Sequence, residues 1–285
     1  MVGGEWTGGS VVEVTQLALY PVKGCAAVYV PSLEISATGP RHDRSFMVVD
    51  GNGLARTQRG DPRLATIVPE IVYSGAQLTL RAPEMPDLAV AVRADGPQRD
   101  VEMFAAPYRA IDQGDEAAQW VSDVLGASSR LVRVPPDHHR VVDGYVSGSA
   151  GFADSGALTL LSETSLALLN NKIRANGREP VPMDRFRGNV IVDGWAEPNV
   201  EDRIREASIR DTALGFLKLD IRCAVTMVDQ QLGCRAGAEP LATLAQYRRA
   251  DVGGVAFGIK LSVVGEGTIA VGDAVDVSAW ESVGG

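Results

Sequence analysis

The apolar positions of this chain fall mostly into short runs separated by Gly, Pro, Asp and Asn, a pattern typical of β-strands joined by turns. Imperfect alternation over residues 11–19 predicts a first strand, which ends at the Pro and Gly of residues 20–24. Turn residues at 50–53 predict a hairpin, because Asn and Gly accept positive φ. The other strands predicted in the first half span residues 28–35, 45–49, 71–74, 77–81, 88–93, 108–111 and 131–134. Their spacing indicates a barrel or sandwich.

Helical periodicity is limited to a few segments. A helix is predicted from Asp115 to the C′ glycine at 126, and a clearer one begins at Ser162, a good N-cap residue, and continues to about residue 176. A short third helix is predicted over residues 240–247. Strands are predicted around them at 158–161, 190–192, 216–228, 255–264, 268–271 and 274–277. We therefore expect an α+β fold that is mostly β.

A turn-rich connector favours two domains. The 285 residues can form one large domain or two ordinary ones. Residues 135–149 are rich in Pro, Gly, Ser and Asp, so we place the boundary there, between a β-rich first domain at 11–140 and a second domain at 141–280. His138 and His139 lie in this connector and are expected to be exposed loop residues, with no third metal ligand in view.

The charge balance and cysteine content exclude several classes of protein. With 27 Lys+Arg against 36 Asp+Glu, the net charge of −9 argues against a general nucleic-acid binder, so clustered cations would point to a specific anion. The three cysteines include no CxxC pair and no zinc-finger spacing, which fits a reducing compartment. No uncharged apolar stretch approaches the ~18 residues of a membrane span, and residues 1–10 do not resemble a signal peptide. We expect a cytoplasmic protein with a frayed start.

The segment 219–229 carries the strongest candidate chemistry. Cys223 follows Arg222 inside an apolar run, and a neighbouring guanidinium favours the thiolate form of a cysteine. A thiolate can act as a nucleophile, a redox group or a metal ligand, whereas a lone cysteine in a strand is more often a small buried hydrophobe. Cys25 and Cys234 are interpreted as structural.

Four cations recur beside turns. Lys23, Arg44, Arg187 and Arg222 each follow a turn or open a strand near Gly or Pro, where the backbone can approach a ligand closely. Taken singly, each is more often a surface or salt-bridge cation. If they meet in space, they form a site for an anion such as phosphate.

Several motifs, in order along the chain, resemble a known family. The first set is Tyr-Pro-Val-Lys-Gly-Cys at 20–25, Gly39 with Asp43-Arg44, and Thr57-Gln58-Arg59. The second set is Asp-Arg-Phe-Arg-Gly-Asn at 184–189, Arg222-Cys223 with Thr226 and Asp229, Leu241 and Leu244 with Tyr247-Arg248, and Gly267 to Asp273. The first set is similar to the N-terminal β-rich domain that precedes a MOSC domain, and the second resembles the MOSC domain itself. Together, over residues 11–280, they resemble the family of the mitochondrial amidoxime-reducing component and its bacterial relatives.

This resemblance implies a molybdenum cofactor, a metal held by the dithiolene of a molybdopterin. Cys223 would be the protein ligand to molybdenum, and a soft thiolate suits such a metal. The residues implied to hold the pterin phosphate and polar edge are Lys23, Arg44, Arg187 and Arg222. Further cofactor contacts are implied for Gly24, Asp154, Ser155, Gly156, Asn189 and Ile221. Gly24 stands where the family usually has serine, and Gly156 where threonine is frequent, so we expect backbone N–H contacts at both.

The implied activity is the reduction of N-hydroxylated substrates, amidoximes and hydroxylamines, with release of water after two electrons and two protons arrive. No cysteine-rich extension follows residue 280, so electrons are expected from a separate carrier, a ferredoxin or a cytochrome b5-like protein with a flavin reductase. An alternative remains, because MOSC domains also occur at the end of molybdenum-cofactor sulfurases. In that case a persulfide on Cys223 could pass sulfur to the cofactor. A third reading is a β-barrel binding module in which Cys223 is merely buried.

Overall fold

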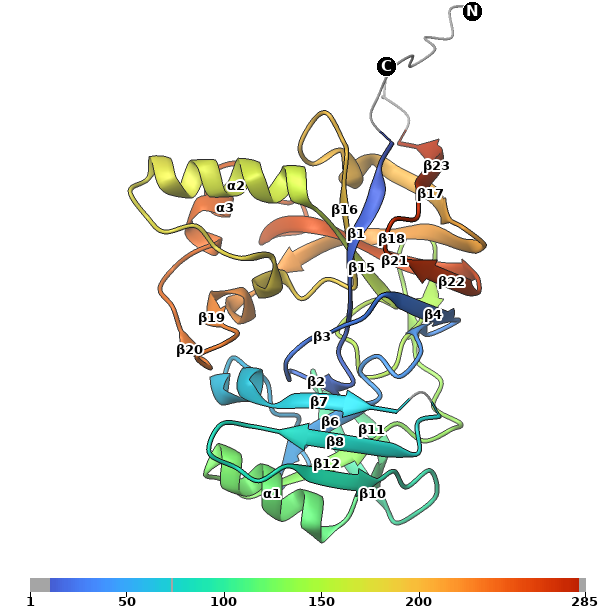
Figure 1. The fold of residues 1–285 in the computed structure, drawn as a ribbon, viewed down its shortest axis with the longest axis vertical. Coiled ribbons are helices and arrows are strands. Elements are labelled where there is room, and N and C mark those ends of the chain that lie inside the picture. Colours follow the sequence, from blue (N-terminus) through green and yellow to red (C-terminus); the bar gives the residue numbers. More distant parts are fainter. Residues whose placement is uncertain (1–10, 73, 282–285) are drawn as a thin grey trace, which may run out of the picture.

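The computed structural model describes residues 11–72 and 74–281, so the expected frayed start at residues 1–10 lies outside the described residues. The chain forms two lobes, one above the other in Figure 1. The C-terminal lobe is built on an eight-stranded sheet. In order across the sheet its strands are β23 (Val275–Trp280), β17 (Ile204–Ile209), β18 (Thr212–Arg222), β21 (Val255–Gly265), β15 (Leu158–Ser162), β16 (Val190–Asp193), β1 (Glu13–Leu19) and β3 (Val28–Tyr29).

The N-terminal lobe contains a five-stranded sheet of β10 (Gln98–Met103), β11 (Ala106–Asp112), β12 (Ser129–Arg133), β6 (Phe46–Asp50) and β2 (Val22–Lys23). A three-stranded sheet of β7 (Val68–Ile71), β8 (Gln77–Arg81) and β9 (Leu88–Ala91) packs with it. The smaller sheets of the molecule are β22 (Gly267–Ala270) with β4 (Ser32–Ser36) and β5 (Gly39–Pro40), β13 (Val141–Val142) with β14 (Gly148–Ser149), and β19 (Val228–Asp229) with β20 (Cys234–Arg235).

Each lobe has its own apolar core. Leu17, Leu160 and Ile259 are fully buried in the C-terminal lobe, where side chains on one face of neighbouring strands meet. In the N-terminal lobe, Phe46 and Leu131 pack with the buried face of α1 (Asp115–Leu125). The cleft between the lobes is lined largely by polar and charged side chains.

The other two helices lie in the C-terminal lobe (Figure 1). In α2 (Glu163–Ala175), the Ser162 side chain accepts a hydrogen bond from the Ser165 backbone N–H, as the predicted N-cap requires. α3 (Leu241–Tyr247) packs against α2 through Leu244. No helix within the described residues is long and apolar enough to cross a membrane.

The chain passes between the lobes near its start. β1 pairs antiparallel with β16 in the C-terminal lobe, whereas β2, a few residues later, pairs in parallel with β6 in the N-terminal lobe. β4 then returns to pair with β22, and the bend at Asp43 and Arg44 leads back to β6. These crossings place Lys23 and Arg44 at the junction of the lobes.

The predicted α+β, mostly β fold is confirmed, with local corrections. The strand expected at 28–35 is two strands, because Pro31 lies between β3 and β4 and has no N–H to donate. The strand expected at 216–228 ends at Arg222, and a 3-10 turn over Ala224–Met227 follows. β10 and β17 were not predicted as strands, since their sequences are largely polar on the exposed face.

Candidate functional site

A cleft lies where the two lobes meet, and its open space is about 930 Å³ including the part open to solvent. The N-terminal half contributes Lys23, Gly24, Arg44, Thr57, Gln58 and Arg59 to its lining. The C-terminal half contributes Ala153, Asp154, Ser155, Gly156, Thr159, Arg185, Phe186, Arg187, Asn189, Asp220, Ile221, Arg222, Cys223, Val225, Thr226 and Lys260. Every site residue predicted from the sequence is in this set, so the fold brings all of them to one place.

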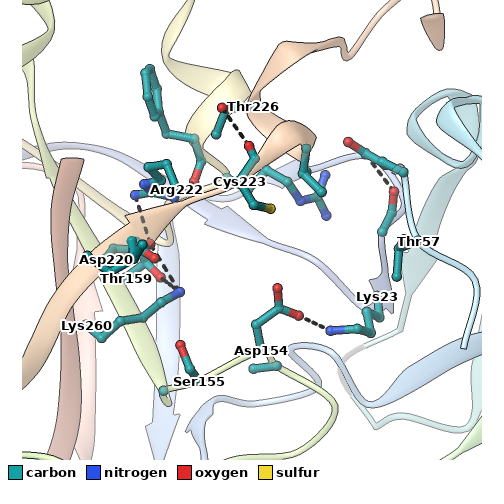
Figure 2. A pocket seen from close by; sticks show the side chains of 18 of the residues that line it. Lys23, Thr57, Asp154, Ser155, Thr159, Asp220, Arg222, Cys223, Thr226 and Lys260 are labelled. Carbon is teal, nitrogen blue, oxygen red and sulfur yellow. Dashed lines mark hydrogen bonds and ion pairs between the residues drawn. The ribbon is translucent and has the colours of Figure 1, made fainter. Parts of the chain in front are cut away.

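Cys223 stands at the end of β18, on the wall of the cleft and partly exposed. The apolar run predicted that Cys223 lies inside a strand, and this prediction is wrong, because β18 ends at Arg222. Its carbonyl accepts hydrogen bonds from the Thr226 N–H at 3.1 Å and the Thr226 hydroxyl at 3.0 Å, which close the 3-10 turn and stop the strand. Figure 2 shows the Cys223 side chain pointing into the same open space as Lys23, Asp154 and Lys260.

The guanidinium that touches the thiol comes from the other lobe. Arg59 Nη1 lies 3.6 Å from Cys223 Sγ. Arg222, the neighbour in sequence, is 7 % exposed in its side chain and donates to the carbonyls of Phe257, at 2.8 and 2.6 Å, and Phe186, at 2.7 Å. Arg222 thus ties the end of β18 to β21 and to the segment that precedes Arg187.

Arg44 is held by a buried network. Its Nη1 donates to the Asp43 carboxylate and to Asn189 Oδ1 at 3.0 Å, and its Nη2 donates to the Arg187 carbonyl at 3.1 Å. The Asn189 amide is 1 % exposed and also accepts from the Thr159 N–H. Arg44 adopts a left-handed φ of 45°, which the bend between the lobes imposes.

Arg187 has no carboxylate partner within ion-pair distance among the described residues. Its Nη1 donates to Gln230 Oε1 at 3.0 Å, and its guanidinium carbon lies 4.4 Å from the centre of the Tyr20 ring. The guanidinium carbon of Arg44 lies 4.2 Å from the centre of the same ring. Burial lowers the pKa of Arg187 from its ordinary value. Gln230 exchanges hydrogen bonds of 2.9 and 3.0 Å with Gln58, so an amide pair joins the two lobes beneath this cation.

Lys23 and Asp154 form an ion pair across the cleft (Figure 2). Burial lowers the pKa of Lys23, and Asp154 opposes that shift. The Asp154 side chain keeps about half of its surface exposed, but it lies within the cleft walls, and desolvation alone would raise its pKa; Lys23 outweighs this effect and holds the pKa below its ordinary value. Lys23 Nζ also donates to the Phe152 carbonyl at 2.9 Å, which fixes the loop that carries Asp154.

The cleft has the charge expected of an anion site. Seven of its lining residues are Lys or Arg and only two are Asp, in a chain of net charge −9. Within the described residues no group of three or more His, Cys, Asp or Glu side chains could hold a metal ion. The Cys223 thiol suits a soft metal, and the cations around it suit an anionic ligand.

Comparison with known proteins decides the family. Residues 11–128 match the MOSC N-terminal beta barrel domain, and residues 147–276 match the MOSC domain. The mitochondrial amidoxime-reducing component 1 of Mus musculus is 32 % identical over 93 % of this chain and 82 % of that protein. This chain belongs to the MOSC family. The component 2 of Bos taurus is 31 % identical, over 93 % of this chain and 83 % of that protein. A molybdenum cofactor sulfurase of Anopheles gambiae is 31 % identical over 89 % of this chain, which spans 34 % of that longer protein.

Two glycines of this MOSC protein lie where relatives are expected to have hydroxyl side chains. Gly24 has a φ of +80°, and its carbonyl accepts from Gln58 at 2.7 Å. A Cβ at Gly156 would lie 3.0 Å from a Leu217 methyl and 3.1 Å from Lys260 Cβ, so this position is tightly packed. Glycine therefore suits the left-handed backbone at position 24, where a Cβ would lie 3.3 Å from a Leu64 methyl, and lets Lys260 pack closely at position 156.

The remaining predicted residues of the MOSC domain lie on the rim. The Arg140 guanidinium donates to the carbonyls of Gly151, Ala153 and Asp154, and so shapes the loop that presents Ser155. Ile221 is 38 % exposed at the cleft edge.

Sequence reasoning missed Lys260. Its Nζ donates to Thr159 Oγ1 at 3.0 Å and pairs with Asp220 at 3.2 Å, while Asp220 also pairs with Arg222 at 2.8 Å (Figure 2). Burial lowers the pKa of Lys260, and Asp220 opposes that shift. A signal was present, because Lys260 is the one charged residue in the apolar run 255–264.

The connector histidines differ from expectation in one respect. His139 is exposed as predicted, but His138 is partly buried, with its ring 5.9 Å from those of Tyr108 and Phe152. Packing against these two aromatic rings explains why His138 is partly buried.

Proposed function

We propose that this protein is a molybdenum-cofactor-dependent reductase of N-hydroxylated compounds. The observation that carries the proposal is the Cys223 thiol on the wall of a cleft whose lining holds seven Lys or Arg side chains. The similarity to amidoxime-reducing components over most of their length supports it. When bound, the cofactor would supply a metal centre that exchanges two electrons with the substrate.

The residues of the chain would divide the binding task. Cys223 would ligate the metal, and Lys23, Arg44, Arg187 and Arg222 would hold the phosphate and polar edge of the pterin. Arg187 meets this role best, because burial disfavours its charged form and it has no carboxylate within ion-pair distance among the described residues. Backbone and side-chain groups at Gly24, Asp154, Ser155, Gly156, Asn189 and Ile221 would complete the contacts.

The proposed reaction needs two electrons and two protons besides the substrate. An amidoxime takes up two electrons and two protons, its N–O bond breaks, and an amidine and one water form. The electrons would come from a separate carrier protein, a ferredoxin or a cytochrome b5-like protein with its flavin reductase. The open cleft mouth leaves Cys223 partly exposed, and a carrier could approach there.

The test begins with cofactor content. Protein produced in a host that makes the pterin cofactor is analysed for molybdenum and pterin, as wild type, Cys223→Ala and Cys234→Ala. Cys234 is exposed and lies outside the cleft lining, so its variant is the matched control. We expect near one molybdenum per chain in wild type and Cys234→Ala, loss of the metal in Cys223→Ala, and benzamidoxime reduction with reduced methyl viologen as donor. Wild type free of molybdenum would refute the proposal.

A second candidate is sulfur handling, which the similarity to a molybdenum cofactor sulfurase favours. The partly exposed thiol could carry a persulfide for transfer to the cofactor. Cyanolysis and intact mass would then find sulfane sulfur in wild type and not in Cys223→Ala, without amidoxime reduction. Reduction at a rate proportional to molybdenum content, with no sulfane sulfur, would exclude this candidate.

A further inference from the structure

An aromatic ring stands at an unusual backbone position beside the cleft. Phe104 and Ala105 form the two-residue turn between β10 and β11, with left-handed φ values of 55° and 60°. Turns of this type favour Asn and Gly, because other side chains crowd the backbone there. The fold thus holds a phenylalanine where the turn itself gains nothing from one, and backbone of this kind gathers at functional sites.

The ring is turned toward the cations of the cleft. Lys23 Nζ lies 5.0 Å and Arg59 Cζ 5.8 Å from the centre of the Phe104 ring, and both residues line the cleft. Arg59 also contacts Cys223 Sγ at 3.6 Å, and its carbonyl accepts a hydrogen bond from Arg235 Nη2 at 3.2 Å. Phe104, Arg59 and Cys223 therefore form a continuous series of ring, guanidinium and thiol.

The ring retains surface for a further contact. Phe104 is 48 % exposed, although it neighbours two cations. A planar aromatic group can stack on such a ring, and a guanidinium plane can stack on the same group. A small aliphatic substrate has no planar aromatic group to stack on this ring.

We propose that Phe104 is a specificity-determining residue that, with Arg59, binds the planar aromatic group of a substrate whose N-hydroxyl end lies at Cys223. The proposal rests on the proposed reductase function, which it extends by naming the substrate class. Thr57-Gln58-Arg59 gains a role in this way: Gln58 fixes the loop to Gly24 at 2.7 Å, and Arg59 faces the substrate.

The test compares two substrates in three proteins. Phe104→Asn removes the ring but suits the left-handed backbone, so its thermal midpoint should not fall below that of wild type. Phe104→Tyr keeps the ring. For benzamidoxime, kcat/KM should fall roughly three- to tenfold in Phe104→Asn, mainly through KM, and stay within about twofold in Phe104→Tyr. For acetamidoxime all three proteins should agree within about twofold. Equal losses for both substrates, or no loss for benzamidoxime, would overturn the proposal.

Binding separates this inference from the proposed function. Calorimetry without an electron donor measures the affinity of cofactor-loaded protein for benzamidoxime. A wild type that reduces neither substrate refutes the reductase function, while an affinity for benzamidoxime that falls in Phe104→Asn and returns in Phe104→Tyr still supports the aromatic site. Equal affinity in wild type and Phe104→Asn would refute the aromatic site even in an active enzyme.

Discussion

Replacing Asn189 by alanine should destabilise the whole protein, because this side chain joins both lobes. Its amide has two donors and two acceptor positions, and all four are used by protein groups. Nδ2 donates to the Ala18 carbonyl at 3.1 Å and to Asp43 Oδ1 at 3.2 Å. Oδ1 accepts from Arg44 Nη1 at 3.0 Å and from the Thr159 N–H at 3.2 Å.

The size of the effect follows from these four contacts. A buried hydrogen bond contributes about 1 kcal/mol net, and a bond to a charged group contributes more, so the four bonds together contribute at least about 4 kcal/mol. Alanine also leaves the Thr159 N–H without its acceptor in a residue only 3 % exposed, which keeps the cost from being recovered through water. At an m-value of about 3 kcal/mol/M in urea, the midpoint of unfolding should fall by more than 1 M.

Equilibrium unfolding in urea, followed by far-ultraviolet circular dichroism, measures this loss. The matched control is Asn171→Ala on the exposed face of α2, which should change the free energy of unfolding by less than about 0.5 kcal/mol. If Asn189→Ala lowers the free energy of unfolding by no more than the control does, the buried network does not hold the lobes together.

Three further predictions concern stability. Gly258→Ala should lower the free energy of unfolding by more than 2 kcal/mol, because φ is +73° and a Cβ would lie 2.7 Å from the Leu160 carbonyl, whereas Gly237→Ala, with φ +91° and open space, should cost about 1 kcal/mol in the same urea titration. Burial raises the pKa of Glu201 from 4.5 to about 7. The stability contributed by the protonated carboxyl is therefore fully present below pH 4.5 and is lost as the pH rises through 7. Glu201→Gln should flatten the pH dependence of the thermal midpoint between pH 4.5 and pH 7. Ser162→Ala removes the α2 N-cap and should cost about 1 kcal/mol by thermal unfolding, whereas no loss would mean that tertiary packing alone fixes that helix start.

The sequence was informative where the site depends on local backbone. Lys23 and Arg44 stand beside turns, and the same turns carry the chain between the lobes. The turn residues that marked these two cations in the sequence therefore also place them at the junction of the lobes. Arg187 ends a 3-10 turn in the left-handed conformation, with φ 54°. Periodicity likewise predicted the start of α2 at Ser162, because an N-cap and an apolar face are both local signals.

The sequence was uninformative where the site depends on contacts between distant segments. Arg222 is adjacent to Cys223 in sequence, but the guanidinium within 3.6 Å of the thiol belongs to Arg59, and 164 residues separate the two. Nothing local in Arg59 shows this, because the contact exists only once the lobes have packed. The end of β18 was missed for a related reason: the apolar run continues past Cys223, and only the Thr226 hydrogen bonds to the Cys223 carbonyl show that the strand stops.

The cleft gathers positive charge that burial makes unfavourable. Among the described residues Arg187 has no carboxylate within ion-pair distance, and Asp220 is shared by Arg222 and Lys260, so the cleft contains more positive charge than its carboxylates offset. Burial lowers the pKa of Arg187 and of Lys260, which is the sign of that unfavourable free energy. An anion bound among these groups would offset this unfavourable free energy, so anion binding would stabilise the folded protein.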